Sequence, residues 1–301
     1  MASQLRQVLG IASLRPEIRG ILLTLLAMGL FGCMDGLSKI LVSHYPTPLV
    51  LWLRHVMAVP VAFLILARKR PLHLLHSRIP GRQLLRAALL IVEMNLVLMA
   101  FQVMPLADAH AILAVTPLLV TALSVPFLGE QVGWRRTLAV VIGFMGVLVI
   151  LRPGMGVLQP GAILAVIAAF LYAFYNIITR RISAFDSANT TFLLQTIFGA
   201  LLLTFVGPFF WVTPALHHWP LLVGQATLGA VGHLCLVRAL SLAPAVVVQP
   251  FTYTLLLYAV VFGYLLFGDV PDLPTLAGAA IVVAAGVYAA VRTHKRAEAQ
   301  S

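Results

Sequence analysis

Residues 20–40 read GILLTLLAMGLFGCMDGLSKI, and this stretch decides the fold. Its first fifteen residues carry no charge, and Asp35, Ser38 and Lys39 then follow. A helix needs about 20 apolar residues to cross a hydrocarbon core of about 30 Å. At about 1.5 Å per residue, Asp35 would lie roughly two thirds of the way across. Because an ionised group is costly there, we expect Asp35 to face a protein interior or a water-filled path.

Residues 161–181, GAILAVIAAFLYAFYNIITRR, repeat this pattern at an offset of 141. The offset pairs Gly20 with Gly161, Phe31 with Tyr172, Asp35 with Asn176, Ser38 with Thr179 and Lys39 with Arg180. Chance aligns apolar residues easily, but it matches D-x-x-S-K to N-x-x-T-R less often. We therefore interpret the chain as two copies of one membrane unit.

The composition is that of an integral membrane protein. Hydrophobic residues make up 61% of the 301 residues and charged residues 10%, and the mean hydropathy is +1.02. Soluble domains have about 25% charged residues. The net charge of +11 could indicate nucleic acid. However, the basic residues lie between apolar segments, as the positive-inside rule predicts. We expect contact with membrane lipids and no nucleic-acid partner.

The two cysteines, Cys33 and Cys235, both fall inside apolar segments. The chain has no Cys-x-x-Cys motif and no Cys/His spacing typical of zinc sites. We therefore expect neither a disulfide framework, nor a metal site, nor a cofactor. The first apolar run is too long for the core of a signal peptide, so we expect it to remain in the mature protein.

The predicted fold is all-α, with ten transmembrane helices. The predicted spans are residues 20–42, 48–67, 84–103, 107–127, 135–151, 160–180, 189–210, 220–240, 245–267 and 274–291. This division predicts an N-terminal tail (1–19), a first five-helix unit (20–151), a second five-helix unit (160–291) and a C-terminal tail (292–301). The loops are too short to hold a separate catalytic domain.

Lysine and arginine predict the orientation of these spans. If the N-terminus is cytoplasmic, the inner segments contain Arg6, Arg15, Arg19, Arg68, Lys69, Arg70, Arg78, Arg82, Arg135, Arg136, Arg180, Arg181, Arg292, Lys295 and Arg296. The outer loops contain only Arg152. This bias places both termini in the cytoplasm of an inner-membrane protein. Because each unit has five spans, the second must enter the membrane the opposite way round. Inverted repeats of this kind place a substrate site near the midplane and support alternating access.

The repeat continues through the later spans, and its motifs match a known family. At an offset of 139, Pro105 falls on Pro244, Gly129 on Gly268 and Glu130 on Asp269. The motifs are Asp35-x-x-Ser38-Lys39, Trp52-Leu53-Arg54, Pro105-Leu106-Ala107-Asp108-Ala109, Thr116-Pro117, Leu128-Gly129-Glu130 and Gly143-Phe144-Met145-Gly146-Val147-Leu148. Together they resemble the EamA family of the drug/metabolite transporter superfamily over nearly the whole chain. The resemblance implies a ten-helix bundle that moves small metabolites, most often outward. Family substrates include amino acids, riboflavin and opine-type metallophores.

The expected function is therefore that of a secondary transporter. We expect it to export a small polar or zwitterionic metabolite, such as an amino-acid-like compound or an opine-type metallophore. The alternatives are an importer of a metabolite such as riboflavin, an intramembrane lipid-modifying enzyme and a channel. The sequence has no P-loop, no G-x-S-x-G motif and no H-E-x-x-H motif. It leaves open whether the protein is a monomer or a homodimer.

Arg54 and Asp35 are the first candidates for substrate contact. Arg54 would lie about 9 Å from the outer end of the second span, at a depth similar to that of Asp35. One interpretation is a structural pair between these two residues. The other is that the Arg54 guanidinium binds a substrate carboxylate. Asp35 could also pair with Lys39, which lies one helical turn away.

Glu93 is a second candidate, because it would lie about 14 Å into the third span, close to the midplane. No basic residue lies one turn away. A lone carboxylate at this depth is expected to carry a proton or to bind a substrate amine. The alternative is a protonated Glu93 that is hydrogen-bonded between helices. Asn95 lies two residues further along the same helix.

The remaining candidates are histidines and neutral amides within spans. They are His110, Asn176, Gln195, His233 and Gln249. At an offset of 141, Gln195 is the counterpart of Arg54, and at 139, His233 is the counterpart of Met94. We expect His233 to line the transport path and the amides to provide milder polarity in the second half.

Two further patterns concern the helices themselves. Gly29, Gly32 and Gly36 form a stripe that is typical of close helix packing. Pro117 and Pro250 are predicted to interrupt the fourth and ninth spans.

Overall fold

The structure is a computed structural model that describes residues 16–66, 73–129, 134–151, 160–182, 184–242 and 248–298. Within these ranges all regular secondary structure is helical. The α-helices are α2 (Pro16–Val42), α3 (Thr47–Leu66), α4 (Pro80–Val103), α5 (Leu106–Leu113), α6 (Thr116–Leu128), α7 (Trp134–Leu151), α8 (Pro160–Ile182), α9 (Ala188–Thr204), α10 (Trp219–Leu242), α12 (Thr254–Phe267) and α13 (Leu273–Glu298). The short 3₁₀ helices are η3 (His73–Leu75), η4 (Gly207–Phe210), η5 (Leu216–His218) and η6 (Gln249–Tyr253).

These helices match the ten predicted spans. Among the described residues, six helical segments are long and apolar enough to cross a membrane. Four shorter apolar helices, at Thr137–Leu151, Ala188–Thr204, Phe251–Phe267 and Leu273–Tyr288, account for the other predicted spans. The all-α membrane fold expected from the sequence is therefore confirmed.

The fourth and ninth spans are broken, as their prolines predict. α5 ends at Leu113, and α6 begins at Thr116 with Pro117 in its first turn. In the second half, η6 carries Pro250 in its first turn and precedes α12. A proline is tolerated at the start of a helix because that position needs no N–H donor. Each of the two spans is therefore divided into two helical segments near its proline.

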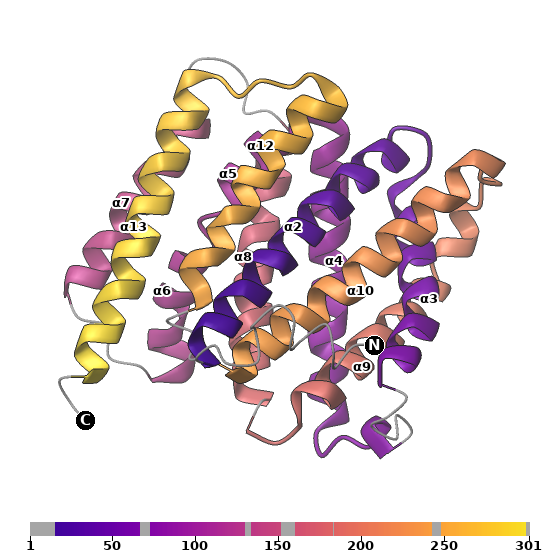
Figure 1. The fold of residues 1–301 in the computed structure, drawn as a ribbon, viewed down its shortest axis with the longest axis horizontal. Helices are drawn as coiled ribbons and strands as arrows, with labels where there is room; N and C mark the ends of the chain where they lie inside the picture. Colours follow the sequence, from indigo (N-terminus) through magenta and orange to yellow (C-terminus); the bar gives the residue numbers. More distant parts are fainter. Residues whose placement is uncertain are drawn as a thin grey trace, which may run out of the picture.

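The helix contacts of the first half have counterparts in the second half. α2 packs on α10 and α12, and its counterpart α8 packs on α4 and α6. α3 packs on its counterpart α9, and α7 packs on its counterpart α13. Figure 1 shows α7 and α13 side by side at one edge of the bundle, while α2 and α10 cross its centre. This pattern is that of a pseudo-twofold relation between the halves.

The C-termini of α6 and α12 have the same cap. Each ends at a glycine in the left-handed region, Gly129 with φ 69° and Gly268 with φ 70°. Glycine adopts this conformation without the steric cost that a Cβ brings. The cap explains the Gly-Glu and Gly-Asp motifs of the sequence. Glu130 itself lies outside the described residues.

The glycine stripe of α2 lies directly against α12. Side chains added at Gly29, Gly32 and Gly36 would meet Tyr258, Phe262 and Leu266. The close packing predicted from the stripe is therefore confirmed.

We expect Gly32→Ala to lower the stability of the folded protein. Its Cβ would lie 2.6 Å from the Cβ of Tyr258. Overpacking of this kind costs about 1–3 kcal/mol. Gly81→Ala is the matched control, because nothing lies within 4 Å of the added Cβ at that position. Melting temperatures in detergent should fall for Gly32→Ala alone, and equal values for the two variants would contradict the tight α2–α12 contact.

Candidate functional site

A cavity lies between the two halves, at the junction of α2, α3, α4, α9 and α10. Its volume in this conformation is about 60 Å³. The lining residues are Met34, Arg54, His55, Ala58, Leu90, Met94, Phe192, Gln195, Thr196, Ala226, Gly229, Ala230 and His233. A mostly apolar wall with a few polar groups is typical of small-molecule sites.

Arg54 is the cationic group of this cavity. It is 6% exposed, and its terminal nitrogens contact the sulfur of Met94 at 2.8 Å and that of Met34 at 3.9 Å. A thioether sulfur is a weak acceptor. The guanidinium also interacts electrostatically with Asp35 and Glu93. Arg54 therefore has strong donor groups that its sulfur contacts satisfy only weakly.

Asp35 pairs with His110 rather than with Arg54 or Lys39. Nε2 of His110 lies 3.1 Å from Oδ2 of Asp35 without forming a hydrogen bond, and both residues are buried. Among the described ion pairs, neither predicted partner of Asp35 is found. The direct Asp35–Arg54 and Asp35–Lys39 pairs expected from the sequence are thus not formed. His110 belongs to α5, which contacts α2 as well as α8 and α12.

Gln195 is buried in the cavity wall with an unsatisfied amide. In the described part of the chain, neither its Nε2 nor its Oε1 has a hydrogen-bond partner. Such atoms are uncommon in protein interiors, since an unmade hydrogen bond leaves the desolvation cost uncompensated. Gln195 is the sequence counterpart of Arg54, so the repeat brings the two counterpart side chains into one cavity.

Two histidines line the same cavity. His233 lies in the wall, and its Nδ1 donates to the carbonyl of Gly229 at 3.0 Å. Its ring contacts the Phe31 ring edge-on at 4.8 Å. His55 also lines the cavity, with Nδ1 2.9 Å from the carbonyl of Leu51. In each case this bond fixes the ring relative to its helix.

Glu93 is buried on α4, one residue before the cavity residue Met94. It is 7% exposed and interacts electrostatically with Arg54 and with Tyr172 of α8. Among the described residues, none forms a hydrogen bond or a close ion pair with its carboxyl group. The alternative of a carboxyl group hydrogen-bonded between helices is therefore not seen in this conformation.

The other predicted amides lie elsewhere. Asn95 accepts a hydrogen bond of 2.6 Å from the hydroxyl of Thr47. Asn176 donates to the carbonyl of Tyr172, one turn earlier on its own helix, at 2.7 Å. The structure does not bring either residue into the cavity wall described above. The side chain of Gln249 lies outside the described residues.

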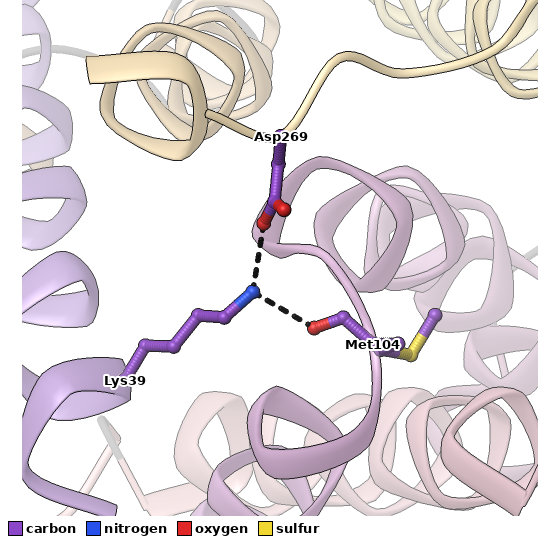
Figure 2. Close-up of polar contacts among 3 residues, drawn as sticks. All are labelled: Lys39, Met104 and Asp269. Atoms are coloured by element: carbon purple, nitrogen blue, oxygen red, sulfur yellow. Dashed lines mark hydrogen bonds and ion pairs between the residues drawn. The ribbon is translucent and has the colours of Figure 1, made fainter. Parts of the chain in front are cut away.

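Lys39, in the last turn of α2, joins the two halves. Figure 2 shows its Nζ between Oδ2 of Asp269, at 2.9 Å, and the carbonyl of Met104, at 3.1 Å. The ammonium also lies 4.7 Å from the centre of the Phe267 ring. This contact was not predicted, although both Lys39 and Asp269 were noted in motifs.

Arg86 is a second buried arginine, and both of its terminal nitrogens have polar partners. It is 2% exposed and donates to the hydroxyl of Tyr175 at 2.9 Å and to the carbonyl of Thr191 at 2.8 Å. Its guanidinium lies 5.1 Å from the centre of the Tyr175 ring. Arg86 was not predicted as a functional or structural residue. The available signal was a charge two residues inside the predicted third span.

Asp186, in the turn between α8 and α9, connects the halves near Arg86. It accepts hydrogen bonds from Gln83 at 2.9 Å, from the backbone N–H of Arg78 at 3.1 Å and from the hydroxyl of Ser77. Partial burial opposes its ionisation, but these hydrogen bonds outweigh burial and hold the pKa of Asp186 below its usual value. This contact stabilises the bundle away from the cavity.

Comparison with known proteins places the chain among transporters. The chain is 34% identical over 208 residues to the riboflavin transporter of Vibrio cholerae, covering 67% of this chain and 69% of the relative. It is 27% identical over 209 residues to an S-adenosylmethionine uptake transporter of Rickettsia bellii, covering 69% and 72%. It is 26% identical over 281 residues to the pseudopaline exporter of Pseudomonas aeruginosa, covering 92% and 97%.

A solved structure has the same fold. This crystal structure of a protein is 17% identical and superposes with a TM-score of 0.62, covering 91% of this chain and 98% of the other. The model of the EamA-like transporter family matches twice, over residues 18–152 and 159–291. The chain therefore belongs to the EamA-like transporter family of the drug/metabolite transporter superfamily, and it is a multi-pass membrane transporter rather than an enzyme.

Proposed function

We propose that the protein is a secondary transporter that exports a small zwitterionic metabolite across the cytoplasmic membrane. The observation that carries this proposal is Arg54, a buried guanidinium in a cavity between the halves whose close contacts are two thioether sulfurs. A guanidinium recognises a carboxylate through two parallel charge-assisted hydrogen bonds. A substrate carboxylate would replace the weak sulfur contacts with strong ones.

The second half of the cavity supports the same proposal. Both amide atoms of Gln195 are without partners among the described residues. An amide can donate to the substrate carboxylate and accept from a neighbouring N–H group. Together, Arg54 and Gln195 would hold one polar end of the substrate, while Met34, Met94 and Phe192 would contact its apolar part.

The amine of the substrate would be held by acidic groups near Arg54. Glu93 and Asp35 both interact electrostatically with the guanidinium, and Asp35 already pairs with His110. Glu93 is therefore the better ligand for an amine, or the carrier of a coupled proton. In either role its carboxyl group would be ionised only when a counter-charge is near.

We assign transport to alternating access between two inverted units, residues 20–151 and 160–291, with cytoplasmic tails 1–19 and 292–301. The repeated packing of the two halves and the position of the cavity between them support this assignment. Inverted-repeat transporters place their substrate near the midplane between the repeats. A single protomer contains all of these proposed substrate contacts, so the assignment does not require a dimer.

The direction of transport rests on the relatives. The pseudopaline exporter matches nearly the whole length of both chains, which favours export. The second candidate is an importer, because the relative from Rickettsia bellii is named an uptake transporter. Comparing the metabolites secreted by cells with and without the protein would distinguish export from import and would identify the substrate.

Transport by the purified protein in liposomes tests the proposed substrate class. We expect counterflow of zwitterionic amino-acid-like compounds without any other component. Methyl esters or amides of the same compounds, which lack the carboxylate, should not compete. Competition by the esters at equal strength would contradict a carboxylate bound to Arg54. Consumption of the compound would indicate an enzyme instead.

The proposed orientation predicts the result of reporter fusions. Fusions within the basic stretch 68–82 and after Arg296 should both report a cytoplasmic location, because lysine and arginine concentrate on that side. A fusion after Arg152 should report the opposite side. An external signal after Arg296 would mean an odd number of spans and would exclude the inverted repeat.

A further inference from the structure

Three segments from both halves meet at Lys39. The lysine lies near the end of α2, Asp269 follows the glycine cap of α12, and Met104 forms the turn between α4 and α5. Figure 2 shows the ammonium between the carboxylate and the carbonyl, with the two acceptors on different chain segments. The contact therefore connects two elements of the first half to one element of the second half.

The two acceptors are held in place by their backbones. Met104 has an extended conformation, φ −147° and ψ 159°, between the end of α4 and Pro105, so its carbonyl leaves the helical direction. Asp269 follows Gly268, and its N–H donates to the carbonyl of Gly263 at 3.1 Å. The flexible partner is the long side chain of Lys39. The ammonium is therefore the group that can leave while the acceptors remain.

The contact is placed where it can be broken and formed again. The side chains of Lys39 and Asp269 are 16% and 25% exposed, so water can solvate both ions when they separate. A partly exposed ion pair contributes less net stability than its attraction alone, because each ion gives up bound water to form it. A pair that is fully enclosed in the bundle would be much harder to open.

The contact also lies between the cavity and one end of the bundle. Met34, in the cavity wall, is five residues before Lys39 on α2, which corresponds to about 7.5 Å along the helix. The α2–α12 contact beneath it is made of the glycine stripe and the side chains facing it. Separation of Lys39 from Asp269 would free the end of α2, the helix that carries Met34 in the cavity wall, to move relative to α12.

The opposite end of the bundle has a related contact. Arg181, at the end of α8, donates to the carbonyl of Phe127 near the end of α6. α8 and α6 are the counterparts of α2 and α12. A basic side chain thus bridges to the end of the broken span at each end of the bundle.

We propose that Lys39 and Asp269 form a latch that closes the Lys39 end of the transport path and opens once in each transport cycle. This inference rests on the proposed alternating-access function. When the latch is closed, the cavity is sealed from that end. When the pair separates, the α12 end moves away from α2 and the cavity becomes accessible.

Cysteine accessibility tests the latch without any transport substrate. The starting protein carries Cys33→Ala, Cys235→Ala and Ala230→Cys, the last in the cavity wall. A membrane-impermeant maleimide is added from the Lys39 side, using intact cells and inverted vesicles to distinguish the two sides. We expect Lys39→Gln and Asp269→Asn each to raise the labelling rate severalfold. The reversed pair, Lys39→Asp with Asp269→Lys, should bring it back toward the starting value.

Asp272→Asn is the matched control, because it removes a carboxylate three residues away that caps α13 instead. It should leave labelling unchanged. Equal labelling in all variants would overturn the latch, and so would the same increase in Asp272→Asn. A lower melting temperature with unchanged labelling of the folded protein would also overturn it.

If the single variants do not fold, the salt dependence of labelling in the starting protein still tests the latch. Its labelling should rise with ionic strength if this ion pair closes the path, and a flat salt response would overturn the latch. A protein that transports no tested compound would contradict the proposed function but would leave these labelling rates interpretable.

Discussion

Arg54→Ala should lower transport by about tenfold to a hundredfold, because a hydrogen bond to a charged group contributes roughly 1.5–3 kcal/mol. The guanidinium contacts only methionine sulfurs closely in the empty cavity, so few native contacts are lost with it. The yield of folded protein should therefore stay near that of the wild type. Counterflow in liposomes and size-exclusion chromatography in detergent measure these two quantities.

Arg86→Ala is the matched control for a buried arginine. Arg86 donates to Tyr175 and Thr191, and its removal would leave a cavity and unpaired groups within the bundle. We expect a loss of folded yield for this variant rather than a selective loss of transport. Arg54→Lys should retain part of the activity, since lysine keeps the charge but cannot form the bidentate pair.

The same variants separate binding from a structural role of Arg54. A structural pair with Asp35 predicts that Arg54→Ala lowers the yield and that the double change with Asp35→Ala restores it. Because Asp35 pairs with His110 in the structure, we expect no such rescue. A low yield of Arg54→Ala that Asp35→Ala repairs would contradict the carboxylate-binding role.

Most of the fold follows from patterns that are local in the sequence. The bilayer sets the length of each apolar run, so the helices appear where the runs appear. Pro117 and Pro250 mark the two broken spans, and Gly129 and Gly268 mark the caps. The internal offset then pairs the helices of the two halves. The matched packing of α2 on α10 and α8 on α4 follows this pairing.

The polar contacts were harder to predict, because the packing of distant segments decides them. Asp35 has Lys39 one turn away, yet it pairs with His110 on α5. Lys39 instead reaches Asp269, 230 residues further along the chain. A sequence pattern gives the depth of a residue but not the direction in which its side chain points across the bundle.

The residues of the cavity were likewise only partly predictable from the sequence. Gln195 was predicted as the counterpart of Arg54, and the structure places both in one cavity. Met34 and Met94 contact the guanidinium, but nothing distinguished them from other apolar residues in the sequence. Asn95 and Asn176 have polar side chains at similar depths, but they form bonds to Thr47 and Tyr172. Polarity within a span identifies candidates, and only packing selects among them.

Glu93→Gln should uncouple transport from the pH gradient while leaving exchange intact. The residue is 7% exposed, and among the described residues its carboxyl group has no close polar partner. An ionised carboxylate is costly in such a place, so the group should be neutral in the empty cavity and charged only when a partner or water is near. Glutamine keeps the shape and most hydrogen-bonding capacity but cannot release a proton. The variant should fold normally and exchange substrate at equal concentrations on both sides.

The decisive measurement is accumulation against a gradient in liposomes with an imposed pH difference. Wild-type protein should concentrate the substrate, and Glu93→Gln should only equilibrate it. Glu17→Gln, at the exposed start of α2, is the control and should behave as the wild type. Loss of exchange as well as accumulation would favour a Glu93 carboxylate that binds the substrate amine, since glutamine cannot provide that charge. Wild-type accumulation with an unchanged pH dependence would exclude both roles and would make Glu93 a residue of helix packing.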